Sequence, residues 1–301
     1  MGICDGRIAI VTGAGRGLGR AHALELAGQG ARVVVNDLGV ALNGSGRDAA
    51  TAHAVVDEIV ASGGDAVANG YDVVDWDGAR SLVQTALDRF GGLDVLVNNA
   101  GFTRDRMVVT CTEEERDAVI GVHLKGHFAP TRHAAGYWRD RAKAGEPVDA
   151  RIINTSSGAG LLGSVGQAAY SAAKAGIAVL TIVEAEELGR YGVTVNGLAP
   201  SARTRMTEEV FAGQMARPER GFDAMDPANV SPLVAWLASS DSRDVTGQVF
   251  EVEGGRVSVA ERWHHGPARN QRARWDPGQL GPVVRELLAG ARPPDPVYGT
   301  Q

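Results

Sequence analysis

The sequence predicts an α/β protein in which helices cover both faces of one doubly wound parallel sheet. Short runs rich in Val, Ile or Leu alternate with amphipathic stretches from the first residues to about residue 252. The short runs are apolar on both faces, as a parallel strand between two helical layers must be. Seven strands and six crossovers fit one such sheet.

The predicted elements follow one another without an internal repeat or a Pro-rich linker. The strands are expected at Arg7–Thr12, Arg32–Asn36, Ala66–Ala68, Leu93–Val97, Arg151–Thr155, Val193–Leu198 and Gln248–Val252. The helices are expected at Gly17–Gln29, Ala49–Ser62, Asp77–Phe90, Glu113–Tyr137, Ala168–Arg190 and Asn229–Ala238. We therefore predict a single domain over residues 1–255, followed by a C-terminal extension over residues 256–301.

The extension is more basic than the rest of the chain, with seven arginines and four acids between Arg256 and Gln301. It is expected to form an arm with one short helix near Pro282–Leu288. The favoured interpretation is that the arm packs over a neighbouring subunit. The alternatives are that it closes a substrate pocket or that its arginines bind substrate phosphates.

Composition excludes several classes of function. The net charge is −6 and the first 250 residues have no basic block, which argues against nucleic-acid binding. Cys4 and Cys111 are too few for a disulfide framework and lack metal-ligand spacing, so a reducing compartment and no metal are expected. We find no stretch approaching the roughly 20 apolar residues that span a bilayer and no signal sequence. We expect a cytoplasmic protein with no membrane partner.

A glycine-rich turn, Thr12-Gly-Ala-Gly-Arg-Gly-Leu-Gly19, connects the first predicted strand to the first helix. Backbone N–H groups in such a turn can approach a pyrophosphate, and the helix dipole favours the anion. The second strand ends at Asp37, whose carboxylate could accept hydrogen bonds from both adenosine ribose hydroxyls and repel a 2′-phosphate. This pattern predicts NAD as the cofactor. A simple strand-end cap is the alternative role for Asp37.

Ser157, Tyr170 and Lys174 form a second cluster. Tyr170 and Lys174 are four residues apart at the start of a predicted helix and share one face. An unperturbed Tyr has a pKa of about 10, which a neighbouring ammonium and a nicotinamide cation would lower toward the range of a general base. Ser157, at a strand end, could hydrogen-bond the substrate oxygen. The cluster predicts hydride transfer between a secondary alcohol or ketone and a nicotinamide.

These motifs, together with Asn98-Asn99-Ala100-Gly101, Thr246-Gly247-Gln248 and Glu253-Gly254-Gly255, resemble those of the short-chain dehydrogenase/reductase family. The resemblance runs from about residue 6 to 255 and implies a Rossmann-type sheet of order 3-2-1-4-5-6-7. It implies that Tyr170, Lys174 and Ser157 are catalytic. The residues it implies for the cofactor are Gly13, Arg16, Gly17, Leu18, Gly19, Asp37, Asp72, Val73, Asn99, Ala100, Gly101, Tyr170, Lys174, Pro200 and Ala202.

A narrower resemblance links Val35-Asn36-Asp37-Leu38-Gly39, Val122-His123-Leu124-Lys125-Gly126 and Arg205-Met206-Thr207 to the dehydrogenase unit of peroxisomal multifunctional enzyme type 2. That unit oxidises (3R)-hydroxyacyl-CoA with NAD, so the resemblance implies oxidation of a 3-hydroxyacyl-CoA, in lipid or steroid metabolism. The alternatives are a hydroxysteroid or other secondary-alcohol dehydrogenase, a 3-oxoacyl carrier-protein reductase and a non-catalytic cofactor sensor. Asp37 disfavours the reductase, which usually takes NADPH. The presence of both Tyr170 and Lys174 disfavours the sensor.

The sequence departs from the family pattern at two places. His123 stands where the family has a helix Asn that supports a proton path to solvent. Our hypothesis is that His123 keeps this path, largely through its backbone carbonyl; a packed structural histidine is the alternative. After the sixth strand the usual Pro-Gly is Pro200-Ser201, and Thr204 falls one place early, so the contacts of this loop with the nicotinamide are left open.

Small residues occur on more than one face of the helices expected at Glu113–Tyr137 and Ala168–Arg190. They would allow close approach of a symmetry mate, and the family resemblance implies a homodimer or homotetramer. The only other partner expected is a small-molecule substrate, acyl-CoA or steroid-like.

Overall fold

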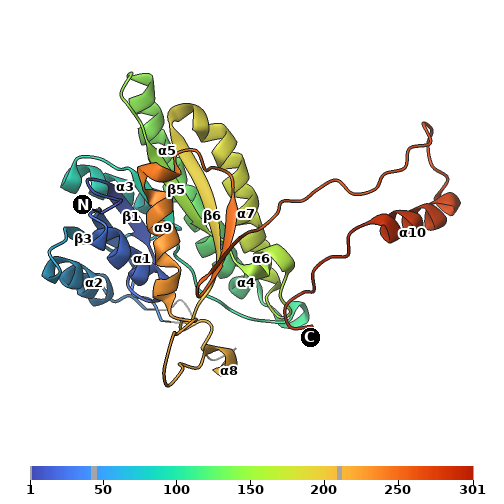
Figure 1. Ribbon diagram of the computed structural model, residues 1–301, viewed down its shortest axis with the longest axis horizontal. Helices are drawn as coiled ribbons and strands as arrows, with labels where there is room; N and C mark the ends of the chain where they lie inside the picture. The colour runs from blue at the N-terminus through green and yellow to red at the C-terminus, as the bar shows by residue number, and fades with distance from the viewer. Residues whose placement is uncertain (1, 42–45, 209–211, 301) are drawn as a thin grey trace.

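The computed structural model describes residues 2–41, 46–208 and 212–300, which form an eight-stranded sheet with helices on both faces (Figure 1). The strand order is β3-β2-β1-β4-β5-β6-β7-β8. The strands are β1 (Ile8–Thr12), β2 (Arg32–Asn36), β3 (Ala66–Asn69), β4 (Val95–Asn98), β5 (Ala150–Thr155), β6 (Val193–Ser201), β7 (Val249–Glu253) and β8 (Arg256–Val259). The predicted α/β class, and the order of the first seven parallel strands, are confirmed.

The predicted number of strands is wrong by one. β8 pairs antiparallel with β7, with Glu253 opposite Arg256, inside the segment assigned to the extension. Gly254 adopts φ +54°, a left-handed conformation that permits the tight reversal between the two strands. The sequence of β8 is too short to be recognised as a strand without its partner.

Three helices lie on each face of the sheet. One face is covered by α1 (Gly17–Gly28), α2 (Ala50–Ala61) and α9 (Ser231–Ala238), with α1 and α9 side by side (Figure 1). The other is covered by α3 (Trp76–Phe90), α5 (Gly126–Lys143) and α7 (Ala168–Leu188). Alternate strand residues serve the two cores: Val33 and Val35 pack on one face, whereas Val34 packs on the other.

Four further α-helices complete the described part of the chain: α4 (Glu113–Ile120), α6 (Gly158–Leu162), α8 (Ala212–Met215) and α10 (Leu280–Gly290). Single 3₁₀ turns occur at Val108–Thr110, Gly189–Tyr191, Pro227–Asn229, Ser240–Ser242 and Pro277–Gln279. The one continuous helix expected at Glu113–Tyr137 is interrupted, because a π-helical turn, Gly121–Lys125, separates α4 from α5. Such turns frequently occur at functional sites.

The segment Ala168–Tyr191, made of α7 and the turn after it, is long and apolar enough to cross a membrane. The expectation that no stretch has this length and composition is therefore wrong. In the structure α7 packs against β5 and β6 and buries Lys174, Thr181 and Glu184 among its apolar residues. A core helix of a soluble protein passes the same test of length and composition.

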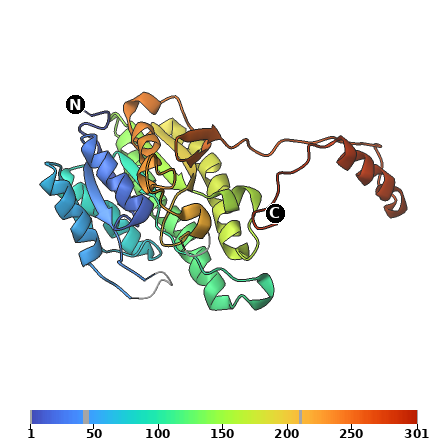
Figure 2. The ribbon, with the colours of Figure 1, turned by 60° about the horizontal axis from the view of Figure 1, so that its bottom comes forward.

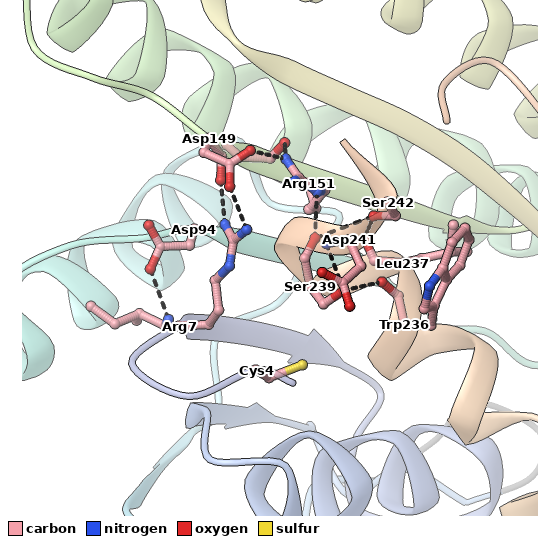
Figure 3. A network of polar contacts seen from close by, with 12 residues as sticks. Cys4, Arg7, Asp94, Asp149, Arg151, Trp236, Leu237, Ser239, Asp241 and Ser242 are labelled. Carbon is pink, nitrogen blue, oxygen red and sulfur yellow. Dashed lines mark hydrogen bonds and ion pairs between the residues drawn. The ribbon is translucent and has the colours of Figure 1, made fainter. Parts of the chain in front are cut away.

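A network of polar contacts joins the amino ends of the strands (Figure 3). Arg151, at the start of β5, is 1% exposed. Its guanidinium binds Asp149 at 2.6 Å and donates to the Ser239 carbonyl at 3.0 Å. Arg7 binds the other oxygen of Asp149 at 2.5 Å. This edge is thus tied together by side chains, and the opposite edge is left for the groups described below.

After β8 the chain leaves the body of the molecule, forms α10 at a distance and returns (Figures 1 and 2). None of the residues of α10 is buried. This helix includes Pro282–Leu288, where the sequence predicts one. The boundary between a domain over residues 1–255 and an extension over residues 256–301 stays a prediction. The predicted packing of the arm on a neighbouring subunit stays a prediction.

Candidate active site

The glycine-rich turn places the start of α1 against the carboxyl ends of the strands. Gly13 has φ +62°, and a Cβ at this position would lie 2.7 Å from Cα of Ala100. A Cβ on Gly19 would collide with the Gly13 carbonyl. Arg16, the residue before α1, makes no side-chain cap, so the first N–H groups of the helix face the cleft without one. This is the arrangement that accepts an anionic pyrophosphate.

Asp37 lies at the far end of this turn, immediately after β2. One carboxylate oxygen accepts the Gly15 N–H at 2.7 Å, and the other accepts the Gly39 N–H at 2.6 Å. Further along the same edge, Asp72 accepts the Val74 N–H at 2.9 Å. These contacts fix two acidic side chains at the mouth of the cleft.

Asn99, after β4, closes the other side of the turn. Its side-chain amide donates to the carbonyls of Thr12 and Gly13 at 2.9 and 3.2 Å. The Thr12 hydroxyl in turn accepts the N–H groups of Asn99 and Ala100 at 2.9 and 3.0 Å. The ends of β1 and β4 are therefore held together where their helices diverge, which is the switch point at which doubly wound sheets bind ligands.

A cleft runs along this edge. Its walls contain the predicted cofactor residues from the glycine-rich turn to Gly101: Gly13, Arg16, Gly17, Leu18, Gly19, Asp37, Asp72, Val73, Asn99, Ala100 and Gly101. An extended dinucleotide suits this cleft for three reasons. Glycines of the turn leave no room for a Cβ, the first N–H groups of α1 have no side-chain cap, and two acidic side chains lie at the far end. The residues present therefore fit the nicotinamide cofactor that the sequence predicts.

Sequence reasoning did not assign all of the lining residues. The cleft is also lined by Asn36, Leu38, Val40, Ala41, Tyr71, Phe102, Val122, Thr204, Arg205 and Met206. Arg205 lies near both Arg16 and Asp37, whose charges act on its pKa in opposite directions. The segment Arg205-Met206-Thr207 carried a family signal but no predicted role. Pro200 and Ala202 are outside the lining, and their contact with the cofactor stays a prediction.

Ser157, Tyr170 and Lys174 come together beyond the Gly101 end of the cleft. Ser157 immediately precedes α6, and its hydroxyl accepts the Ala159 N–H at 3.2 Å. It lies near enough to the Tyr170 phenol to lower the pKa of that group. The Lys174 ammonium lies 5.6 Å from the centre of the Tyr170 ring. It donates to the Thr155 carbonyl at 2.6 Å. The end of β5 thus holds all three groups of the predicted cluster.

Burial dominates the protonation of this cluster. It raises the pKa of Tyr170, the hydrogen bond with Ser157 opposes that rise, and the charge of Asp105 adds to it. Burial also lowers the pKa of Lys174 to about 7. The expectation that the ammonium lowers the pKa of Tyr170 is therefore not met in the protein alone, because Lys174 itself is driven toward its neutral form.

His123 sits in the π-helical turn with its imidazole directed at the cluster. Its ring meets Tyr170 edge-on at a centroid distance of 5.0 Å, and Nε2 lies 2.7 Å from the Phe102 carbonyl. A Cβ on Gly101 would collide with this ring. Burial and the charge of Lys174 lower the pKa of His123 well below its usual value. A neutral imidazole therefore supports Tyr170 from the side.

His127 is a neighbour of Lys174 that sequence reasoning missed. It is 1% exposed in the first turn of α5, and neither ring nitrogen makes a well-aligned hydrogen bond within the described residues. Burial, Lys174 and His123 lower its pKa, and the backbone groups of His123 and Thr155 oppose this. No sequence pattern marks His127, because its proximity to Lys174 depends on the interruption of the helix before it.

No group of three or more His, Cys, Asp or Glu residues that could hold a metal ion occurs in the described ranges. His264, which belongs to the tail, instead lies 3.8 Å from Glu261.

Comparison with known proteins gives concordant matches. The family model "short chain dehydrogenase" matches residues 7–215. A hydroxyacyl-CoA dehydrogenase of Mycobacterium tuberculosis is 48% identical, over 96% of this chain and 90% of that protein. Peroxisomal multifunctional enzyme type 2 of Mus musculus is 44% identical over 86% of this chain, which spans 33% of that longer protein.

A solved structure shares the fold over nearly the whole length. The crystal structure of a short chain dehydrogenase from Mycobacterium avium is 65% identical with a TM-score of 0.90, and the match covers 99% of this chain and all of that one. The cleft, the Ser–Tyr–Lys cluster and these matches lead to one conclusion. The chain belongs to the short-chain dehydrogenase family and is an oxidoreductase.

Proposed function

We propose that this protein oxidises a 3-hydroxyacyl-CoA to the 3-oxoacyl-CoA with NAD as the hydride acceptor. The similarity to the Mycobacterium tuberculosis hydroxyacyl-CoA dehydrogenase carries the choice of substrate, because it extends over 96% of this chain. The contact between Ser157 and Tyr170 carries the choice of chemistry. The reverse direction uses the same groups.

The residues of the site divide the reaction between them. Ser157 and Tyr170 hold the substrate hydroxyl, and Tyr170 removes its proton as the hydride leaves the carbinol carbon. The bound cofactor supplies the electrophilic carbon that receives the hydride. Lys174 is placed to bind the ribose next to the nicotinamide, and in its charged form it would favour the Tyr170 phenolate. Positioning by the ends of β4 and β5 supplies most of the rate enhancement.

Asp37 supports NAD rather than NADP. Both of its oxygens are fixed by backbone N–H groups at the mouth of the cleft, where they can still accept ribose hydroxyls. Arg16 and Arg205 are nearby and could instead hold a phosphate. Comparison of kcat/KM for NAD and NADP decides between these, and Asp37→Ser should shift the ratio toward NADP. A preference of the unmodified enzyme for NADP would overturn this part of the proposal.

We also propose a homodimer or homotetramer formed through the helices on the α5 and α7 face. Phe128 on α5 and Val179 and Val183 on α7 are exposed apolar residues. Light scattering on the purified protein gives the number of subunits, and Val179→Asp should lower this number if α7 forms the interface.

The two free cysteines, Cys4 and Cys111, support a location in the reducing cytosol.

The substrate is tested by following NADH formation with (3R)- and (3S)-hydroxyacyl-CoA esters and with free hydroxysteroids. Activity on one CoA series is expected; activity confined to the free steroids would reject the CoA assignment. In the same assay, Tyr170→Phe should reduce kcat by about 10²- to 10⁴-fold and leave NADH binding intact. Activity of this variant within about tenfold of the unmodified enzyme would contradict the role of Tyr170.

A further inference from the structure

The last residues of the tail return to the body of the molecule. The Val165 N–H donates to the Tyr298 carbonyl at 3.0 Å, and the Tyr298 N–H donates to the Gly163 carbonyl at 3.2 Å. Tyr298 therefore forms a parallel β-bridge with Ser164. In Figures 1 and 2 the C-terminus lies against the body, whereas α10 lies far from it. We call residues 297–300 the terminal segment.

The terminal segment docks on the stretch of chain between two catalytic residues. Residues 158–166 begin directly after Ser157 and end shortly before Tyr170. A Cβ placed on Gly158 would lie 2.7 Å from the Tyr298 hydroxyl and 3.1 Å from its ring. The phenol of Tyr298 therefore covers the residue next to the catalytic serine. A Cβ on Gly163 would be 3.5 Å from Val297.

The side chains at this contact remain available to a ligand. Tyr298 is 46% exposed and Val297 39% exposed, and Val165, which packs beside Gly299, is 49% exposed. Half-exposed apolar groups beside a catalytic hydroxyl are typical of a binding-site wall.

A second apolar run approaches the same stretch from the other side. The Arg106 N–H donates to the Gly166 carbonyl at 2.7 Å. The three residues that follow, Met107, Val108 and Val109, are 54%, 73% and 92% exposed. Exposed apolar side chains of both the terminal segment and residues 107–109 therefore lie next to residues 163–167.

Charge near the terminal segment disfavours the phosphate-rich end of a CoA ester. The segment itself contains no charged side chain. Glu251 and Glu253 on β7 act electrostatically on the Tyr298 phenol. An uncharged, apolar group is therefore favoured on this side, and a polyanion is not.

We propose that the terminal segment forms one wall of the substrate pocket and selects substrates with a bulky apolar acyl group. This inference rests on the proposed function, because it names the substrate class within 3-hydroxyacyl-CoA esters. Tyr298 is the specificity-determining residue, and the extended arm before it serves to deliver this residue to the site.

The experiment compares a short substrate, 3-hydroxybutyryl-CoA, with a long one, 3-hydroxyhexadecanoyl-CoA. The variants are Tyr298→Ala, a chain ending at Asp295, and the control Trp263→Ala, which alters a side chain of the same tail that is 96% exposed. For the first two we expect kcat/KM with the long substrate to fall by about tenfold or more, mainly through KM. For the same two variants, kcat/KM with the short substrate should change by less than about threefold. The control variant should keep the kcat/KM of the unmodified enzyme with both substrates.

An equal loss with both substrates, or no loss with either, would overturn the proposal. Binding of the two 3-oxoacyl-CoA products to the NADH complex provides the same comparison without turnover. The melting curve and NADH binding show whether the shortened chain folds. If it does not, the result for Tyr298→Ala alone tests whether the terminal segment forms the pocket wall.

Failure of the proposed function would be recognised separately. In that case the unmodified enzyme would oxidise free secondary alcohols and not CoA esters. A small alcohol and a sterol would then replace the two esters, and the same selective loss with Tyr298→Ala would support the wall while the CoA assignment was abandoned.

Discussion

Two buried basic side chains at opposite edges of the sheet have different surroundings. Arg151, at the amino end of β5, is 1% exposed and bound to Asp149 and the Ser239 carbonyl. Lys174, near the carboxyl end of the same strand, is 3% exposed, and its one hydrogen bond among the described residues is to the Thr155 carbonyl. Burial lowers the pKa of both, and only Arg151 has a carboxylate that opposes this.

The difference separates a structural cation from a reactive one. Arg151 stays charged because a carboxylate compensates its burial. Lys174 lacks such a partner, and its pKa of about 7 keeps it ready to change charge when a phenolate or cofactor arrives. The same fold thus completes the polar contacts at one edge and leaves them incomplete at the other. Variants can test both halves of this comparison.

The largest effect is expected for Lys174→Met. Turnover should fall by about a thousandfold, which corresponds to about 4 kcal/mol of lost transition-state stabilisation. The pH dependence of stability should change as well. Between about pH 7 and 10.5 the unfolded chain binds the Lys174 proton and the folded protein does not, so raising the pH stabilises the unmodified protein.

Urea unfolding at several pH values measures this slope. Relative to the unmodified protein, Lys174→Met should be more stable at pH 7 and lose the advantage by pH 10. A variant with the same pH slope as the unmodified protein would show that Lys174 remains charged in the folded state.

Arg151→Met should instead affect stability. The Arg151 side chain is 1% exposed, and its replacement takes a donor from the Ser239 carbonyl and one cation from Asp149. The free energy of unfolding should therefore fall by about 3 kcal/mol. In the folded fraction kcat/KM should be nearly unchanged, because none of the residues in the network (Figure 3) lines the cleft. Arg7→Met is the matched control, because it removes another cation from Asp149 without emptying a buried site. A loss of turnover without a loss of stability would invert the comparison.

Glu184 on α7 is a buried acid whose effect on the pH dependence of stability can be measured in the same way. Burial raises its pKa to about 7, and one oxygen accepts the Asn154 amide at 2.9 Å. Between about pH 4.5 and 7 the folded protein binds the proton and the unfolded chain does not, so stability is lost as the pH rises. Glu184→Gln should remove this slope and be more stable than the unmodified protein at pH 8 by about 3 kcal/mol. Equal stability at pH 8 would contradict the buried, protonated acid.

The smallest effect is expected for His123→Ala. If the proton path uses the backbone carbonyl of His123, the variant retains it, and kcat should fall by less than about tenfold. The pH–rate profile distinguishes the roles: an unchanged profile and kcat eliminate a side-chain relay, and a displaced profile supports one. His123→Phe is the control for the ring that packs against Tyr170.

The parts predicted from sequence are those set by local spacing. The glycine-rich turn, Asp37 at a strand end, and Tyr170 four residues before Lys174 each imply a position without reference to the rest of the chain. The π-helical turn, β8 and the neighbourhood of His127 depend on partners distant in sequence. The raised pKa of Tyr170 also escaped prediction, because spacing does not reveal that the phenol and Lys174 are both buried.

The return of the tail has a practical consequence for protein production. The chain ends two residues after Gly299, which packs beside Val165 in the stretch between Ser157 and Tyr170. An affinity tag fused there would start beside this stretch and, if the terminal segment forms the proposed wall, would compete with large substrates. The N-terminal residues lie elsewhere, where Cys4 donates its N–H to the Gln29 carbonyl. Tags and surface-immobilisation linkers therefore belong at the N-terminus.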